Sequence, residues 1–334
     1  MKAMVVRAAN QPLVMEERPL PQPGRGQVRI KVHACGVCHS DSFVTQGLWP
    51  ALQLPRICGH EVAGTIDAVG EGVATLAVGE RVGVGWHGGH DGTCRACLRG
   101  KFIHCEHVQV TGISTDGGYA EYMLAPAVAV ARLPEGMPFE IAAPLLCAGV
   151  TTFNALRRSP ARAGDMVAVH GIGGLGHLGV QYARAMGFDT VAIARGAEKA
   201  DFAHQLGARV YIDSDKEDAA AALLELGGAA VILATAPSAA AISSLMGGLG
   251  IEGALTIVAA AFEPLSISAV DLLTHDQRVQ GWASGTAADS VDAMAFAQRA
   301  GVKPMIEKYP LDQAQTAYER MMAGKARFRA VLEM

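Results

Sequence analysis

A glycine-rich turn between a strand and a helix is the feature that most constrains this chain of 334 residues. Residues 167–170 have the pattern of a short buried strand, and residues 175–186 have that of a helix. The turn between them holds Gly171, Gly173, Gly174 and Gly176. Glycines at this spacing permit a tight turn and let backbone N–H groups approach a pyrophosphate at the helix N-terminus. The turn predicts a dinucleotide-binding unit, and the alternative is a structural turn without a ligand.

The segments around this turn alternate between strands and helices. Further strands are expected at residues 191–194, 210–212, 230–234 and 255–258, and a helix at 199–206. This rhythm predicts a parallel, doubly wound α/β sheet. Short strands at 27–34, 61–69 and 79–84, separated by turns and prolines, predict a mostly β region before it. The expected domains are residues 1–145 with 284–334, mostly β, and residues 146–283, doubly wound.

Composition excludes several classes of protein. Half of the residues are hydrophobic, which argues against disorder, and the net charge of −4 comes without a basic stripe for nucleic acid. No leader is evident in residues 1–23, and no apolar run reaches the roughly 18 residues of a membrane span. We therefore expect a cytoplasmic protein without a membrane or nucleic-acid partner. In that compartment its seven cysteines are metal ligands or buried thiols rather than disulfides.

Cysteines and histidines form two groups with the spacing of metal ligands. The first group is dispersed and comprises Cys38, His60 and Cys147, which fits a catalytic zinc site with three protein ligands and an open position. The second is compact and comprises Asp91, Cys94, Cys97 and Cys105, which fits a closed structural site. The alternatives are a redox pair of Cys35 with Cys38, and a loop that has lost its metal. His90, His104 and His107 are further candidate ligands beside the second group.

Five motifs carry a resemblance that covers the whole chain: G-V-C-H-S-D at 36–41, G-H-E at 59–61, the cysteine loop at 91–105, P-L-L-C-A-G at 144–149, and the glycine turn. Together they resemble the zinc-containing medium-chain alcohol dehydrogenases, in particular the cinnamyl-alcohol-dehydrogenase-like branch. The resemblance implies a GroES-like catalytic domain and a Rossmann domain. It also implies that Cys38, His60 and Cys147 ligate the catalytic zinc, and that Asp91 replaces the first of four structural cysteines.

The resemblance implies roles for residues around the first group. Glu61 would approach the metal, Asp41 would orient His60, and Ser40 would hydrogen-bond the substrate hydroxyl. His39 and Arg329 would contact the cofactor pyrophosphate, and Thr151 the nicotinamide region. By motif spacing Trp49 and Trp86 would line the substrate pocket, and Trp282 would join them from near the end of a Rossmann strand, where the cofactor would lie. The alternative is that one or more of these tryptophans are core residues. The chain departs from the family at Phe43, where a histidine often passes the alcohol proton to solvent.

The end of the second Rossmann strand indicates the coenzyme. NAD enzymes usually carry Asp or Glu there for the ribose 2′-hydroxyl, whereas this chain has Ala194 and Arg195. An arginine can bind a 2′-phosphate with charge-assisted bonds, and Lys199 follows one helical turn later. The pattern favours NADP, with NAD and an unliganded surface Arg195 as the alternatives.

These features predict a zinc-dependent alcohol dehydrogenase that transfers hydride between NADP(H) and primary alcohols or aldehydes, aliphatic or aromatic. It would bind small-molecule substrates and form a homo-oligomer, a dimer or tetramer. Alternatives are the same fold with NAD(H), a zinc-free reductase, a polyol dehydrogenase, or a non-catalytic nucleotide-binding structural or sensor protein. A zinc-free reductase would lack the first group, and a polyol dehydrogenase usually has a carboxylate in place of Cys147.

Overall fold

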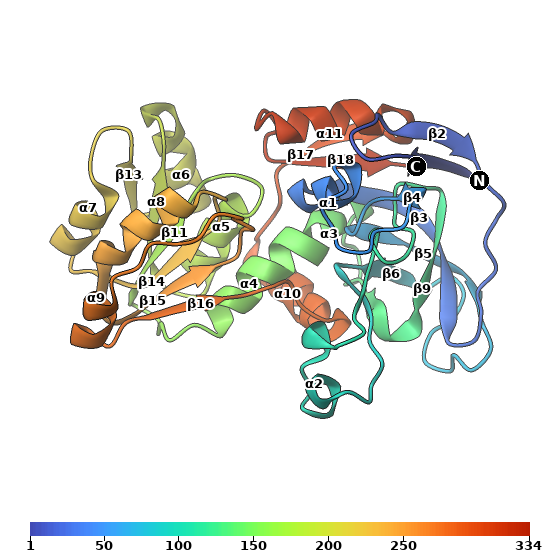
Figure 1. Ribbon diagram of the computed structural model, residues 1–334, viewed down its shortest axis with the longest axis horizontal. Helices are drawn as coiled ribbons and strands as arrows, with labels where there is room; N and C mark the ends of the chain where they lie inside the picture. Colours follow the sequence, from blue (N-terminus) through green and yellow to red (C-terminus); the bar gives the residue numbers. More distant parts are fainter. The chain divides into compact units, whose positions relative to one another are not determined.

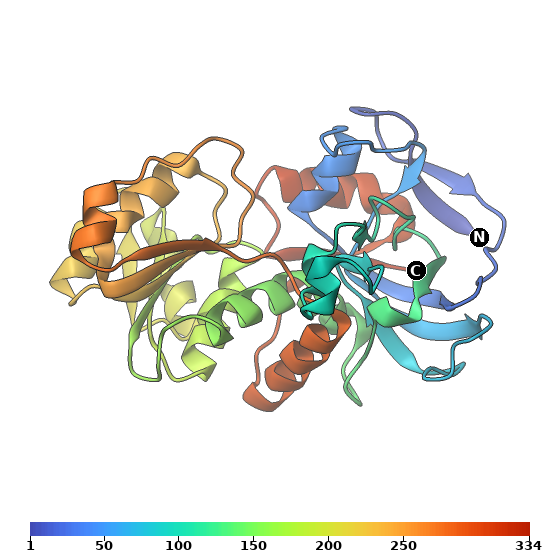
Figure 2. The same cartoon turned by 60° about the horizontal axis from the view of Figure 1, so that its bottom comes forward.

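The computed structural model describes residues 1–334, which divide into two compact units. The first unit comprises residues 1–150, 284–299 and 303–334, and the second comprises residues 151–283 and 300–302. Figures 1 and 2 show the first unit built mainly from strands and the second built around one sheet flanked by helices. Each unit has its own hydrophobic core.

The first unit contains three sheets. The largest has the strand order β10-β6-β5-β3-β18-β17, with β9 also paired to β3. A second sheet has the order β2-β1-β4, and β7 pairs with β8. The strands are β1 (Lys2–Val6), β2 (Val14–Glu17), β3 (Gln27–Val37), β4 (Arg56–Ile57), β5 (Val62–Val69), β6 (Arg81–Val84), β7 (His87–Gly89), β8 (Gln109–Val110), β9 (Tyr122–Pro126), β10 (Val130–Arg132), β17 (Ile306–Pro310) and β18 (Arg329–Glu333).

Helices of this unit are short apart from one. They are α1 (Ser42–Thr45), α2 (Arg95–Leu98), α3 (Phe139–Pro144), α10 (Ala287–Ala300) and α11 (Ala314–Met322). The expected strands at 27–34, 61–69 and 79–84 are confirmed as β3, β5 and β6. Strand β3 is longer than expected and runs to Val37, next to the first candidate ligand.

The second unit is a six-stranded parallel sheet of order β13-β12-β11-β14-β15-β16. Its strands are β11 (Met166–His170), β12 (Asp189–Ala194), β13 (Val210–Asp213), β14 (Ala229–Ala234), β15 (Leu249–Ile257) and β16 (Arg278–Gly281), and its helices are α4 (Val150–Arg157), α5 (Gly176–Ala185), α6 (Ala200–Leu206), α7 (Ala219–Glu225), α8 (Ala239–Ser244) and α9 (Ala269–Thr274). The predicted doubly wound α/β sheet is confirmed. The strand order reverses between β11 and β14, and ligands bind at such a point in open α/β sheets.

One helical run departs from the sequence expectation about membrane spans. Phe139–Arg157 is long and apolar enough to cross a membrane by length and composition. However, 78% of its most apolar window is buried inside the protein, as in the core helix of a soluble protein. The run also contains Pro144 and a π-helical turn, Leu145–Gly149, in which the Val150 N–H reaches the Leu145 carbonyl. It is therefore weak evidence for a membrane span.

Candidate metal and nucleotide sites

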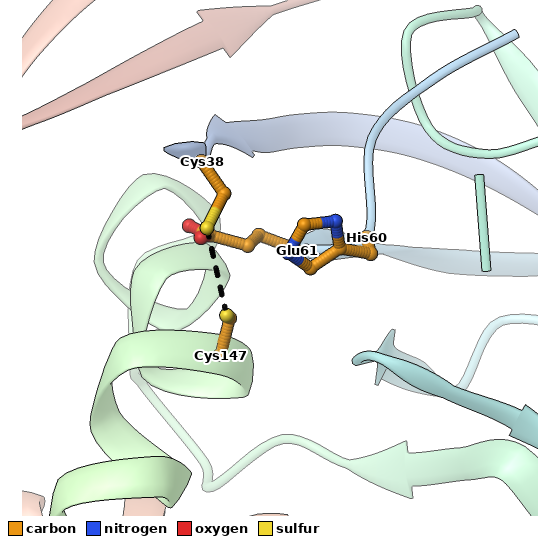
Figure 3. Close-up of side chains that lie close together, drawn as sticks. All are labelled: Cys38, His60, Glu61 and Cys147. Atoms are coloured by element: carbon orange, nitrogen blue, oxygen red, sulfur yellow. Dashed lines mark hydrogen bonds between the residues drawn. The ribbon is translucent and has the colours of Figure 1, made fainter. Parts of the chain in front are cut away.

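Four side chains from three distant segments of the first unit converge at the first candidate site. The possible ligand atoms of Cys38, His60, Glu61 and Cys147 all lie within 4.8 Å of one another. Figure 3 shows the two sulfur atoms facing each other, and they are 3.9 Å apart. Two sulfurs bound to one tetrahedral zinc by bonds of about 2.3 Å would be about 3.8 Å apart. The spacing fits a shared zinc ion, whereas a disulfide needs about 2.05 Å.

Local structure explains how these side chains meet. Cys38 directly follows β3, and His60 and Glu61 directly precede β5, its antiparallel neighbour. Cys147 lies on the π-helical turn, a feature that is frequent at functional sites. Leu146 of this turn packs closely on β6 and the residue after it, because a Cβ at Gly83 would collide with the Leu146 side chain and a Cβ at Gly85 with its carbonyl.

Electrostatics at this site favour a cation. Burial alone would lower the pKa of His60, but the charge of Cys38 and the hydrogen bond to Asp41 raise it to about 10. A hydrogen bond from Cys147 lowers the pKa of Cys38 well below the usual thiol range, against the effect of burial. The buried Nε2 of His60 and Oε2 of Glu61 have no hydrogen-bond partner. Because metals replace ligand protons, this donor set fits a divalent ion.

Asp41 pairs with the Nδ1 side of the His60 imidazole. Its Oδ1 lies 3.3 Å from His60 Nδ1, and its Oδ2 accepts hydrogen bonds from the Cys38 N–H at 2.9 Å and the Tyr119 hydroxyl at 2.7 Å. An acceptor on one ring nitrogen leaves the other nitrogen free for a metal. Nearby, Ser40 is half-buried and His39 is exposed. Sequence reasoning missed Tyr119, which no local pattern marks.

Glu61 and Arg329 form a buried ion pair, a contact that the sequence does not predict. Glu61 is 0% exposed and Arg329 is 5% exposed, and the Arg329 guanidinium donates a hydrogen bond to Glu61 Oε1. Gly36 leaves room for this carboxylate, because a side chain at that position would overlap Glu61. The ion pair brings Arg329 beside the first site, and its contact with a pyrophosphate stays a prediction.

The second candidate site gathers Asp91, Cys94, Cys97 and Cys105, whose ligand atoms also lie within 4.8 Å of one another. The Cys94 and Cys105 sulfurs are 3.8 Å apart, again the spacing around a tetrahedral zinc. Asp91 Oδ1 accepts hydrogen bonds from the backbone N–H groups of Thr93 and Cys94. These bonds, with one from His107, hold the pKa of Asp91 well below its usual range, so the carboxylate is ionised.

The three histidines near this site lie outside the cluster of four possible ligands. His90 stacks on Phe102 with ring centroids 4.3 Å apart, and its Nδ1 lies 3.1 Å from Nε2 of His87. His107 Nδ1 lies 2.7 Å from Asp91 Oδ2, and His104 is exposed. All seven cysteines are free, so Cys35 and Cys38 do not form a disulfide.

Aromatic side chains form a cluster beside the first site. Trp86 packs edge-to-face on His60, with centroids 5.0 Å apart, and on Trp49 at 5.9 Å. Phe43, the departure from the family pattern, lies 5.6 Å from Trp49. The cluster brings two of the three predicted pocket tryptophans together. Trp282 belongs to the second unit, where its ring contacts the Arg158 guanidinium.

The glycine turn of the second unit has the geometry expected of a phosphate loop. It runs from the carboxyl end of β11 to the start of α5. Gly171 has φ +89°, and a side chain at Gly176 would collide with the Gly171 carbonyl. Thr235 Oγ1 holds the turn from β14, 2.8 and 3.0 Å from the His170 and Gly171 carbonyls. Gly173 is exposed, and no neighbouring atom lies where a Cβ would project. Gly174 is half-buried, and Thr151, also predicted to contact the nucleotide, is buried in the same unit.

The end of β12 is held by β13. The Gly196 N–H donates to Asp213 Oδ1 at 2.9 Å, and the Tyr211 hydroxyl donates to the Gly196 carbonyl at 2.7 Å. Arg195 is exposed beside the buried Ala194, and Lys199 Nζ donates to the Arg195 carbonyl at 2.8 Å. Asp213, a carboxylate that sequence reasoning did not consider, is thus bonded to the loop backbone.

Comparison with known proteins gives consistent matches. Residues 24–135 match the family described as alcohol dehydrogenase GroES-like domain, and residues 174–299 match zinc-binding dehydrogenase. The chain is 45% identical to alcohol dehydrogenase notN of Aspergillus sp. (strain MF297-2), covering 100% of this chain and 98% of that protein. It is 41% identical to an alcohol dehydrogenase of Geobacillus stearothermophilus, covering 100% of both.

Solved structures agree with these matches. A cinnamyl alcohol dehydrogenase from Sorghum bicolor superposes with a TM-score of 0.89 at 31% identity, covering 99% of this chain and 97% of that one. The alcohol dehydrogenase of Aeropyrum pernix superposes with a TM-score of 0.91 at 31% identity, covering 100% of both chains.

Proposed function

The chain belongs to the zinc-binding dehydrogenase family with an alcohol dehydrogenase GroES-like domain, and from this premise we propose that it is a zinc-dependent alcohol dehydrogenase. It would interconvert primary alcohols and aldehydes with NADP(H). The observation that carries the proposal is the convergence of Cys38, His60 and Cys147, with two sulfurs 3.9 Å apart and an unpartnered imidazole nitrogen. Glu61, at the same cluster, would be a nearby carboxylate during ligand exchange.

Residues of the first unit would bind the metal, orient its imidazole ligand and hydrogen-bond the reacting oxygen. When bound, zinc would supply a Lewis acid that polarises this oxygen and favours loss of the hydroxyl proton. Asp41 would keep the proton of His60 on Nδ1 so that Nε2 faces the metal, and Ser40 would hydrogen-bond the substrate hydroxyl. Because Phe43 cannot carry a proton, the Ser40 hydroxyl would accept the proton and pass it towards solvent. The nicotinamide nucleotide, bound by the second unit, would exchange the hydride.

The aromatic cluster supports apolar substrates. Trp86 packs on His60, and Trp49 and Phe43 extend the apolar cluster from Trp86. Such walls favour alkyl or aromatic alcohols over polyols, because burying extra hydroxyl groups without partners is unfavourable.

A panel of primary, aromatic and polyhydroxy alcohols, each assayed with NADP⁺ and NAD⁺ by the absorbance of reduced nicotinamide, tests the proposal. Turnover of primary or aromatic alcohols with loss of activity after zinc removal is expected. Nucleotide binding without turnover of any alcohol or aldehyde would support a non-catalytic sensor instead.

Arg195 is the residue that we propose binds the 2′-phosphate of NADP(H). Arg195→Ala should weaken NADPH binding by about 1.5–3 kcal/mol, the scale of a hydrogen bond to a charged group, and leave NADH nearly unaffected. Arg209→Ala is the matched control, because Arg209 pairs with Asp189 at the amino end of β12. Titration of nucleotide fluorescence measures both affinities. Equal losses for NADPH and NADH would show that Arg195 does not select the phosphate, and tighter NADH binding by the wild type would favour the NAD(H) alternative.

The second site would hold a structural zinc in the proposed enzyme. Asp91→Ala should lower the zinc content from about two to about one per chain and lower the melting temperature, because metal binding there is coupled to folding. Asp91→Cys should retain both metals. Elemental analysis and thermal unfolding measure these effects. A wild-type zinc content of one, with Cys94, Cys97 and Cys105 open to thiol reagents, would leave Asp91 as an ordinary loop residue.

The proposed enzyme would act in the cytoplasm as a homo-oligomer. Seven free cysteines are compatible with a reducing compartment, where thiols persist. In the second unit Phe262, Val270 and Leu273 are exposed, and large exposed apolar side chains can mark contacts between subunits. Light scattering of the purified protein would give the number of subunits.

A further inference from the structure

Asp41 is a buried carboxylate whose charge is stabilised by three different groups. It is 2% exposed, and its ion-pair partner is His60, which is 1% exposed. The Cys38 N–H and the Tyr119 hydroxyl both donate to Oδ2, at 2.9 and 2.7 Å. Inside a protein such a carboxylate depends on its donors, because no water replaces a donor that is lost.

Tyr119 also contacts the backbone that leads into His60. Its N–H donates to the Cys58 carbonyl at 3.0 Å, and the Gly118 N–H donates to the Gly59 carbonyl at 3.0 Å. Gly59 has φ +98°, and a Cβ there would lie 2.5 Å from Cδ1 of the Tyr119 ring. The ring therefore occupies space that only a glycine before His60 can leave open. Tyr119 thus contacts both Asp41, which bonds the His60 imidazole, and the backbone that leads into His60.

The hydroxyl is suited to a permanent donor role. Tyr119 is 0% exposed, and burial together with the charge of Asp41 raises its pKa well above the usual range, so it keeps its proton. With this proton directed at Oδ2, the Oδ1 atom of Asp41 remains available to His60 Nδ1.

We propose that Tyr119 is a positioning residue of the first metal site, which orients His60 through Asp41 and Gly59. The proposal rests on the proposed zinc function of Cys38, His60 and Cys147. Mutation of a residue that hydrogen-bonds a metal-bound histidine typically lowers metal affinity by about 10–100-fold. Tyr119 bonds Asp41 and not His60 itself, so it is one hydrogen bond further from the metal. We therefore expect an effect near the lower end of that range.

Tyr119→Phe tests the hydroxyl while it keeps the ring over Gly59. The matched control is Tyr318→Phe, because the Tyr318 hydroxyl is also buried in the first unit but lies 2.7 Å from Thr45 Oγ1 instead of a residue of the metal site. Zinc transfer to a chromophoric chelator measures affinity, and the visible spectrum of the cobalt-substituted protein reports the geometry around the metal. We expect about ten-fold weaker zinc retention and an altered cobalt spectrum for Tyr119→Phe alone.

Two further results would decide the question. If both variants retain zinc equally and give the wild-type cobalt spectrum, the hydroxyl has only a structural role and the proposal is overturned. In an Asp41→Asn background the additional Tyr119→Phe change should have a smaller effect on zinc retention, since the two residues act in series. Full additivity would overturn the proposal even if Tyr119→Phe alone were poorly folded. A wild-type protein that takes up no metal at this site would instead refute the proposed function.

Discussion

Replacing Cys147 by alanine is expected to reduce alcohol oxidation by at least about 10³-fold, with nucleotide affinity nearly unchanged. The metal's stabilisation of charge on the reacting oxygen amounts to several kcal/mol, and each 1.36 kcal/mol is a factor of about ten in rate. Cys147 would supply one of three metal ligands in the first unit, whereas the glycine turn for the nucleotide lies in the second. Steady-state rates and fluorescence titration with NADPH measure the two effects separately.

Cys58→Ala is the matched control for this variant. Cys58 is 0% exposed and belongs to the same unit, but it is outside both ligand clusters. It should lose some stability through the cavity left by the sulfur and keep its zinc and its turnover. Undiminished turnover by the Cys147→Ala protein would remove this residue from the mechanism.

Arg329→Met is expected to destabilise the protein by about 3–5 kcal/mol, the range measured when one partner of a buried ion pair is removed. Glu61 is 0% exposed, its Oε2 has no partner, and Arg329 is the residue that bonds its Oε1. In the metal-free protein the variant would therefore leave a buried carboxylate without the guanidinium that bonds it. Urea unfolding, followed by circular dichroism, measures the loss.

Two further variants separate burial from charge. Arg320→Met removes the partner of Glu307 in a more exposed pair, and should destabilise the protein much less than Arg329→Met. Glu61→Met combined with Arg329→Met should recover most of the lost stability, because replacing both partners of a buried pair by apolar groups is often neutral. If Arg329→Met is no more harmful than Arg320→Met, Glu61 does not depend on this ion pair.

Local patterns were sufficient to predict five of the six strands of the second unit and its helices α5 and α6. Strands of a parallel sheet are short apolar runs, and helices between them have a different period, so β11, α5 and β12 could be recognised from residues close together in sequence. Strand β15 was predicted only from residue 255, because Gly250 and Gly253 interrupt its apolar pattern. Strand β16 was not predicted, because it is a short edge strand, Arg278–Gly281, without buried residues.

Contacts over long sequence separations could not be predicted from single residues. The pairing of Arg329 with Glu61 joins residues 268 positions apart, and the bond from Tyr119 to Asp41 spans 78 positions. The first depends on how β3, β5 and β18 pair in the finished sheet. The second depends on the backbone hydrogen bonds that join Tyr119 to Met4 and Cys58. The π-helical turn around Cys147 likewise has no recognised sequence pattern, although the motif that contains it was evident.

The central proposal is that alcohol oxidation depends on zinc at Cys38, His60 and Cys147. The most direct measurement removes zinc from the protein with a chelator and returns it in stoichiometric portions, with metal content and turnover recorded at each step. Turnover should disappear with the zinc of the first site and return in proportion as that site is refilled. Full turnover of a primary alcohol by protein that contains no metal would contradict the proposal.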